Sequence, residues 1–246
     1  MDVLFFALVG ALAQFVDGSI GMGFGMLSST LLITIGTSAA LASASVHLAE
    51  IGTTLVSGVS HWRRSNVDFG LLKQLAIPGS LGAFLGAHFL SSLDLSSAKD
   101  FVSLVLFALG FFVLYKVIFA RNFAIPHGRR TMPLICLTAG FVDAAGGGGW
   151  GPLATPVLIS ATDLEPRKVV GTVSAAEFLV AISATLGFLM NFNKIGFDLV
   201  MVLGLAAGGM LVAPIAARIV SVMPRLWLGV SVGVGIVLIN GFRLVL

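Results

Sequence analysis

The sequence contains very little charge. Of its 246 residues only 10% are Asp, Glu, Lys or Arg, whereas 57% are hydrophobic, and the mean hydropathy is +1.06. A soluble domain carries roughly 25% charged residues, so this chain has too few polar groups to cover a surface that faces water. Its apolar runs have the length of helices, not of alternating strands of about ten residues, which favours a helical membrane protein over a β-barrel.

Cysteine is equally scarce. The single cysteine, Cys136, has no partner in the chain, so no intrachain disulfide can form. The sequence contains no Cys/His cluster that would predict a metal site and no nucleophile–base pair that would predict an enzyme. It also shows no hydrophilic domain that could hydrolyse ATP. The net charge is +3. We interpret it as the Lys and Arg residues that orient a membrane protein, and not as a sign of nucleic-acid binding. We therefore expect a membrane protein without enzymatic activity, cofactor, metal or nucleic-acid partner.

Ten apolar segments are present, and they predict an all-α, polytopic membrane protein with a single transmembrane domain over residues 1–246. Crossing the hydrocarbon takes about 20 helical residues, and the first two segments of each half are shorter than that. Short, glycine-interrupted segments at corresponding places in two halves are typical of a transporter's binding site. The segments are 3–16, 20–36, 40–60, 70–92, 98–119, 132–145, 149–162, 167–190, 198–220 and 225–245.

Each short pair meets at a glycine-rich stretch, which we call an elbow. The first elbow covers residues 15–25 and the second covers residues 141–151. With an offset of 126 the two align in Phe, Val, Asp and three glycines, and Trp150 falls on Phe24. Each elbow therefore joins two helices that are too short to cross the bilayer alone.

The two halves of the chain are repeats of each other, over residues 1–120 and 130–246. At an offset of 127, Glu50 falls on Glu177 and Gly82 falls on Gly209. We interpret the small residues around Gly82 as positions where helices pack closely.

The distribution of lysine and arginine predicts the topology. If each short pair makes no net crossing, 11 of these residues lie near the loops of one side and 3 near the other, and the positive side faces the cytoplasm. Both termini then lie on the non-cytoplasmic side of the cytoplasmic (inner) membrane, and the repeats are inverted. The larger group is Arg63, Arg64, Lys73, Lys116, Arg121, Arg129, Arg130, Arg167, Lys168, Arg218 and Arg225; the smaller is Lys99, Lys194 and Arg243.

Ionisable residues within the apolar segments are costly and point to function. We predict that His47, Glu50 and Glu177 exchange protons. A protonated glutamic acid bonded to a neighbouring helix, or a direct substrate contact, is an alternative for the two glutamates. Asp17 and Asp143 precede glycine turns, where a carboxylate commonly caps the following helix. His88, which has no repeat counterpart, is interpreted as structural.

The elbows predict a site for a small anion. Glycine permits close backbone approach, and a helix that begins after it directs unpaired N–H groups and a positive dipole end at the elbow. Irregular backbone at membrane depth is tolerated where it lines a cavity or is buried in protein. The candidate substrate-binding residues are Gln14, Asp17, Ser19, Gly21, Gly23, Phe24, Gly25, Ser28, Ser29, Asp143, Gly147, Gly149, Trp150, Gly151 and Thr155.

The chain resembles the sulfite exporter TauE/SafE family, also called the toluene-sulfonate uptake permease family. The resemblance rests on both elbows, on Gly36 with residues 42–53, and on residues 61–68. It implies a secondary carrier that moves sulfite, sulfonates or related anions across the cytoplasmic membrane. The residues themselves lead only to a small anion.

We therefore predict a secondary transporter of a small sulfur-containing oxyanion, coupled to protons, in which the repeats alternate access. A passive channel for a small solute and a non-transporting membrane subunit are the alternatives. Besides the anion and the lipid bilayer, a second copy of the chain is a candidate partner, because lipid-facing and partner-facing apolar surfaces look alike in sequence.

Overall fold

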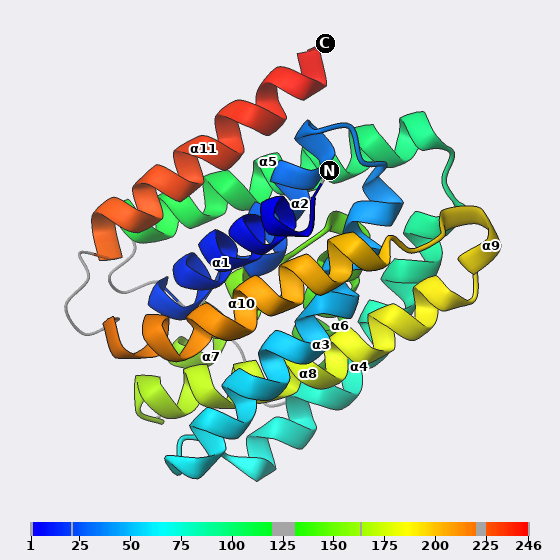
Figure 1. The fold of residues 1–246 in the computed structure, drawn as a ribbon. Coiled ribbons are helices and arrows are strands. Elements are labelled where there is room, and N and C mark those ends of the chain that lie inside the picture. Colours follow the sequence, from blue (N-terminus) through cyan, green and yellow to red (C-terminus); the bar gives the residue numbers. More distant parts are fainter. Residues whose placement is uncertain (1, 21, 120–130, 163, 220–224, 246) are drawn as a thin grey trace.

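The computed structural model describes residues 2–20, 22–119, 131–162, 164–219 and 225–245, which form helices joined by short connections (Figure 1). The first half holds α1 (Val3–Ile20), α2 (Phe24–Thr34), α3 (Ala39–Arg63), α4 (Phe69–Ser92) and α5 (Leu95–Phe119). The second half holds α6 (Met132–Gly146), α7 (Trp150–Ala161), α8 (Pro166–Leu189), α9 (Phe192–Ile195), α10 (Leu199–Ile219) and α11 (Arg225–Val245).

The all-helical fold and the ten predicted segments are confirmed. The short helix α9 was not predicted, because its four residues are too few to show a helical period. Within the described part of the chain, six helices are long and apolar enough to cross a membrane, namely α3, α4, α5, α8, α10 and α11. The shorter apolar helices are α1, α2, α6 and α7, the pairs that meet at the elbows. This is a multi-pass membrane protein.

The two halves exchange their first helices. Helix α1 packs along α10 of the other half, and α6 packs along α4. Helices α3 and α8 pack against each other, as do α5 and α11. Each contact thus has a counterpart when the halves are interchanged, as expected for two related repeats. That the repeats are inverted across the membrane stays a prediction.

Glycines allow the closest of these contacts. A Cβ atom added to Gly82 on α4 would overlap the carbonyl oxygen of Leu137 on α6, and one added to Gly140 on α6 would overlap the carbonyl oxygen of Gly79. Gly208 on α10 likewise faces the backbone of Ala7 on α1. The prediction that the small residues around Gly82 serve close packing is therefore confirmed.

We expect Gly82→Val to lower the free energy of unfolding by at least about 2 kcal/mol, because the new side chain would push α6 away from α4. Gly235→Val on α11 is the matched control, since nothing lies within 4 Å of a Cβ atom at that position. Thermal unfolding in detergent measures both. Equal losses in the two variants would show that the α4–α6 contact is not the cause.

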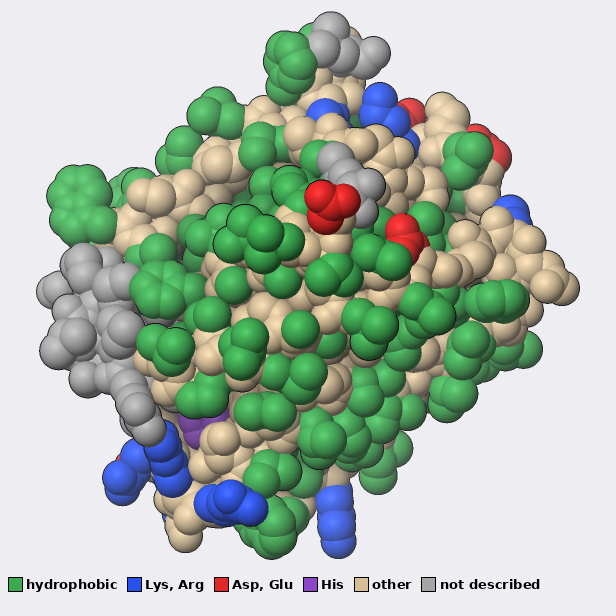
Figure 2. Space-filling view, viewed as in Figure 1, with side chains coloured by type: hydrophobic (Ala, Val, Ile, Leu, Met, Phe, Trp, Pro, Cys, Tyr) green, Lys and Arg blue, Asp and Glu red, His purple; other side chains and the backbone are tan. Residues whose placement is uncertain are grey.

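The surface agrees with a membrane location. Hydrophobic side chains cover the middle of the face shown in Figure 2, with Lys and Arg at its lower and upper margins. Figure 1 shows both termini and α9 toward one end of the bundle, and the turn from α3 to α4 at the other. These ends correspond to the two groups of loops that the lysine and arginine count separates. Which end faces the cytoplasm stays a prediction.

Candidate functional site

The two elbows touch each other through their backbones. A Cβ atom on Gly25 would lie 2.8 Å from Cα of Gly148, and one on Gly148 would overlap the backbone nitrogen of Met26. Gly148 has a φ of 139°, a conformation that glycine adopts without steric cost. The start of α2 and the turn between α6 and α7 therefore approach at a distance that no side chain allows. The structure brings together the two stretches that the repeat pointed out.

Asp143 links α6 to the start of α7. Its Oδ1 accepts hydrogen bonds from the backbone N–H groups of Gly149 (2.7 Å) and Trp150 (3.0 Å). The repeat-equivalent Asp17 lines the polar side of the site together with Phe24, the first residue of α2. Capping by Asp143 is confirmed, and capping by Asp17 stays a prediction. The expectation that the first N–H groups of α7 stay unpaired is wrong for Gly149 and Trp150, because Asp143 already occupies them.

The second oxygen of Asp143 faces a histidine of the other half. Oδ2 lies 3.3 Å from Nε2 of His47, and both side chains are buried. Nδ1 of His47 lies 2.8 Å from the carbonyl oxygen of Ser43, one helical turn earlier. Because a carbonyl oxygen only accepts, Nδ1 carries a proton. The Ser43 hydroxyl in turn donates to the carbonyl oxygen of Ala144, which holds α3 against α6.

Two cavities meet at this point, each with a volume of about 10 Å³, room for about one water molecule. Glu50 and Glu177 line both cavities, and Phe24 is also common to them. The first, which we call the polar cavity, is lined by Gln14, Asp17, Phe24, Glu50, Thr53, Thr54, Ser57, Ser174 and Glu177. The second, the elbow cavity, is lined by Gly23, Phe24, Gly25, Met26, Glu50, Asp143, Gly148, Gly149, Trp150, Gly151, Pro152 and Glu177.

All the charged residues that line these cavities are acidic. They are Asp17, Glu50, Asp143 and Glu177, and no lysine or arginine lines either cavity among the residues that the structure describes. His47 approaches this acidic group, with its Nε2 4.0 Å from Oε2 of Glu50. The described His, Cys, Asp and Glu side chains form no group of three or more suited to a metal ion. The site therefore places four acidic side chains and one histidine beside the two elbows.

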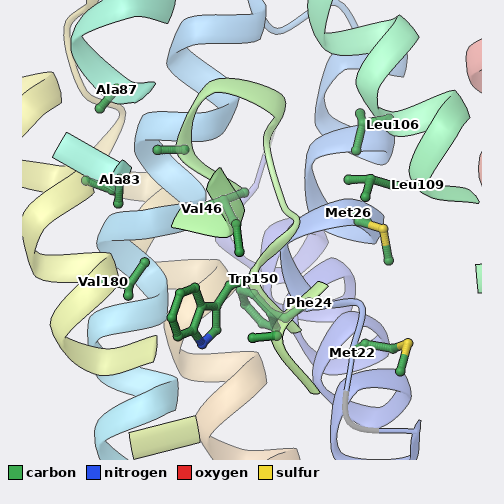
Figure 3. Packing of buried hydrophobic residues seen from close by; sticks show 14 of the residues in the cluster. Met22, Phe24, Met26, Val46, Ala83, Ala87, Leu106, Leu109, Trp150 and Val180 are labelled. Atoms are coloured by element: carbon green, nitrogen blue, oxygen red, sulfur yellow. The ribbon is translucent and has the colours of Figure 1, made fainter. Parts of the chain in front are cut away.

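Trp150 and Phe24, which the repeat aligns, both reach the elbow cavity (Figure 3). The indole N–H of Trp150 donates to the carbonyl oxygen of Val173 on α8 over 3.2 Å, and its ring packs against Gly79 on α4. The ring of Phe24 faces Gly209 on α10. Trp150 thus lies beside a glycine of α4, the helix that packs along α6. Phe24 lies beside a glycine of α10, the helix that packs along α1.

The remaining predicted residues occupy different positions. The hydroxyl groups of Ser28 and Ser29 are buried with no hydrogen-bond partner among the described residues, and Ser29 lies against Gly147. Thr155 is buried on α7 but lines neither cavity. His88 contacts Asn191 at an exposed position, as a structural histidine would. The side chain of Ser19 and the whole of Gly21 lie outside the described residues.

Sequence reasoning missed the hydroxyl groups of the polar cavity and the role of Ser43. Thr53, Thr54 and Ser57 follow Glu50 by three, four and seven positions, so they share its face of α3. Ser174 precedes Glu177 by three positions on α8 in the same way. The helical period would have identified these positions. The contact of Ser43 with Ala144 lies beyond any local pattern.

The fold and this buried polar centre define a multi-pass membrane transporter with interrupted helices at its core. Comparison with known proteins identifies its group: the profile of the sulfite exporter TauE/SafE family matches residues 6–242, and the chain belongs to this family. It is 47% identical over 248 residues to the probable membrane transporter protein YtnM of Bacillus subtilis (strain 168), an alignment that covers 99% of this chain and 83% of that protein. No solved structure matches the chain.

Proposed function

We propose that this protein is a proton-coupled secondary transporter of a small sulfur-containing oxyanion, such as sulfite or a sulfonate, in the cytoplasmic membrane. Membership of the TauE/SafE family supports the substrate class. The observation that carries the proposal is the contact between the two elbows beside four acidic residues, of which Glu50 and Asp143 are buried. Contact between the halves at one buried centre is the geometry that alternating access requires.

Coupling to protons follows from the charges of the site. Asp17 and Glu177 line the polar cavity together with Glu50, and Asp143 and Glu177 line the elbow cavity with it. Two unit negative charges about 5 Å apart repel by about 3 kcal/mol at an effective dielectric constant of about 20. Each ionised carboxylate beside an entering anion makes the free energy of anion binding less favourable by a similar amount. Proton uptake by the site removes this repulsion, and proton release restores it.

Hydroxyl groups supply donors for the anion. Those of Ser28 and Ser29 are buried beside the elbows with no hydrogen-bond partner among the described residues, and Ser57 and Ser174 line the polar cavity. The N-terminal ends of α2 and α7 add favourable dipoles. Because each cavity has room for about one water molecule, a larger anion binds only after the halves move apart. The described conformation is thus the closed one of an alternating-access cycle.

Transport by the purified protein in proteoliposomes tests this function. Labelled sulfite and methanesulfonate are offered outside, and uptake is compared with that of protein-free liposomes. Methanesulfonate keeps its single charge throughout the pH range, so any pH dependence of its uptake belongs to the protein. Uptake of neither anion above the protein-free background would contradict the proposal.

We expect Glu50→Gln and Glu177→Gln each to lower the initial rate of uptake at least about tenfold, which is about 1.4 kcal/mol of activation free energy. Both changes remove a proton-exchanging group that lines the two cavities. Glu165→Gln is the matched control, because Glu165 is exposed and pairs with Arg167 away from the two cavities. Wild-type rates for both variants between about pH 5 and 8 would exclude the glutamates from coupling.

A further inference from the structure

We propose that the anion and a proton bind this protein together and move in the same direction, with the proton held between His47 and Asp143. The protein is then a symporter and not an antiporter. Co-transport rests on the proposed transport function. It adds the direction in which the proton moves relative to the anion, and it names the residues that hold the proton.

The first step is a count of protons. Nδ1 of His47 carries a proton because it faces the carbonyl oxygen of Ser43 at 2.8 Å. The contact of 3.3 Å between Nε2 and Oδ2 of Asp143 then needs one further proton. That proton resides on either the imidazole or the carboxyl group, and in both cases the pair is neutral overall. Without it, an imidazole lone pair faces a carboxylate oxygen.

The second step concerns the surroundings of this pair. Glu50 on α3, Glu177 on α8, Asp17 on α1 and Asp143 on α6 are the charged residues that line the two cavities. Helices α2 and α7 place no charged residue on either cavity among the described residues. An anion therefore finds no fixed positive charge, and proton uptake makes its binding more favourable. By linkage, the bound anion favours the proton equally.

The third step connects proton binding to movement. His47 belongs to α3 of the first half, whereas Asp143 caps α7 of the second half through its other oxygen. The shared proton thus joins the two halves at the elbows, and its loss removes that link. The second half offers no equivalent pair, because Ser174 stands at the position of His47. The His47–Asp143 pair therefore has no counterpart in the second half.

Positive linkage decides the direction of coupling. An antiporter needs its two ligands to exclude each other, so that each crosses alone. When proton and anion favour each other, the state that crosses the membrane carries both. At equilibrium, with the membrane potential clamped at zero, one proton per anion concentrates the anion about tenfold for each pH unit, toward the alkaline side.

The test is accumulation of methanesulfonate and sulfite in proteoliposomes with the potential clamped by potassium and valinomycin. With the outside one pH unit more acidic, we expect about tenfold accumulation of methanesulfonate inside. The sign does not depend on the orientation of the protein in the liposome. Depletion under the same gradient, or equal concentrations on both sides, would overturn co-transport while leaving transport itself established.

The variant His47→Gln assigns the proton site. We expect its accumulation ratio to fall to about 1, because the pair can no longer bind the shared proton, whereas His88→Gln, with the same change at an exposed histidine, keeps about tenfold. Tenfold accumulation by His47→Gln would overturn the assignment to this pair. If neither anion crosses in the wild type, the proposed function fails and co-transport fails with it.

Discussion

Gly148→Ala is expected to abolish transport and to lower the free energy of unfolding by at least about 2 kcal/mol. Two costs add at this position. A non-glycine residue at a φ of 139° is strained by about 1–3 kcal/mol. The added Cβ atom would also overlap the backbone nitrogen of Met26 and lie 2.9 Å from Cα of Gly25, and such overpacking costs about 1–3 kcal/mol. Uptake in proteoliposomes and thermal unfolding measure the two effects.

Gly36→Ala is the matched control for this variant. Gly36 has a φ of 97°, so alanine there is also strained, but no atom lies within 4 Å of the added Cβ. The difference between the two variants isolates the contact between the elbows. If Gly148→Ala transported as well as Gly36→Ala and unfolded at the same temperature, the close approach of the elbows would not be essential for transport.

Asp143→Ala is expected to have the second large effect, a loss of transport together with about 3 kcal/mol of stability. The change removes the partner of His47 and leaves the N–H groups of Gly149 and Trp150 without their acceptor. Asp143→Asn separates the two roles, because an amide oxygen still accepts from both N–H groups. We expect this variant to lose about 1 kcal/mol of stability and still to fall at least about tenfold in its rate of uptake.

Asp198→Asn provides the comparison. Oδ1 of Asp198 also accepts from two backbone N–H groups, those of Val200 and Met201, at the start of α10, but its carboxylate has no histidine partner. A similar small loss of stability with wild-type uptake is expected. Wild-type uptake by Asp143→Asn would contradict a role for the carboxylate beyond capping and would reduce Asp143 to a structural residue.

Membrane segments and elbows could be predicted because both are local patterns. The low charge and the long apolar runs predict a helical bundle in a bilayer. Inside a bilayer every backbone polar group must be paired within its own segment, and a helix does this. The repeat located both elbows and their aspartates at an offset of 126 and the two glutamates at an offset of 127. The small residues around Gly82 predicted close helix packing, which the contacts of α4 with α6 confirm.

The sequence did not fully predict which acceptors bind the backbone N–H groups at the helix N-termini. The position of Asp143 just before the glycines of the second elbow correctly predicted a cap. The same elbow had also predicted unpaired N–H groups for an anion, and the structure gives the first two of these groups to Asp143. A carboxylate in the chain competes with any anion from solution for the same donors. Only the distances show which of the two holds them in this conformation.

The amino-acid sequence by itself determined the class of protein, the repeated elbows and the set of ionisable residues within the apolar segments, because hydropathy, glycine and charge act within a few residues of chain. It did not determine which of these residues meet. His47 and Asp143 lie 96 positions apart, and only the packing of α3 against α6 brings Nε2 within 3.3 Å of Oδ2. The tertiary structure decided this because the exchange of α1 and α6 between the halves places each elbow against helices of the other half, and no local pattern in the chain encodes that exchange.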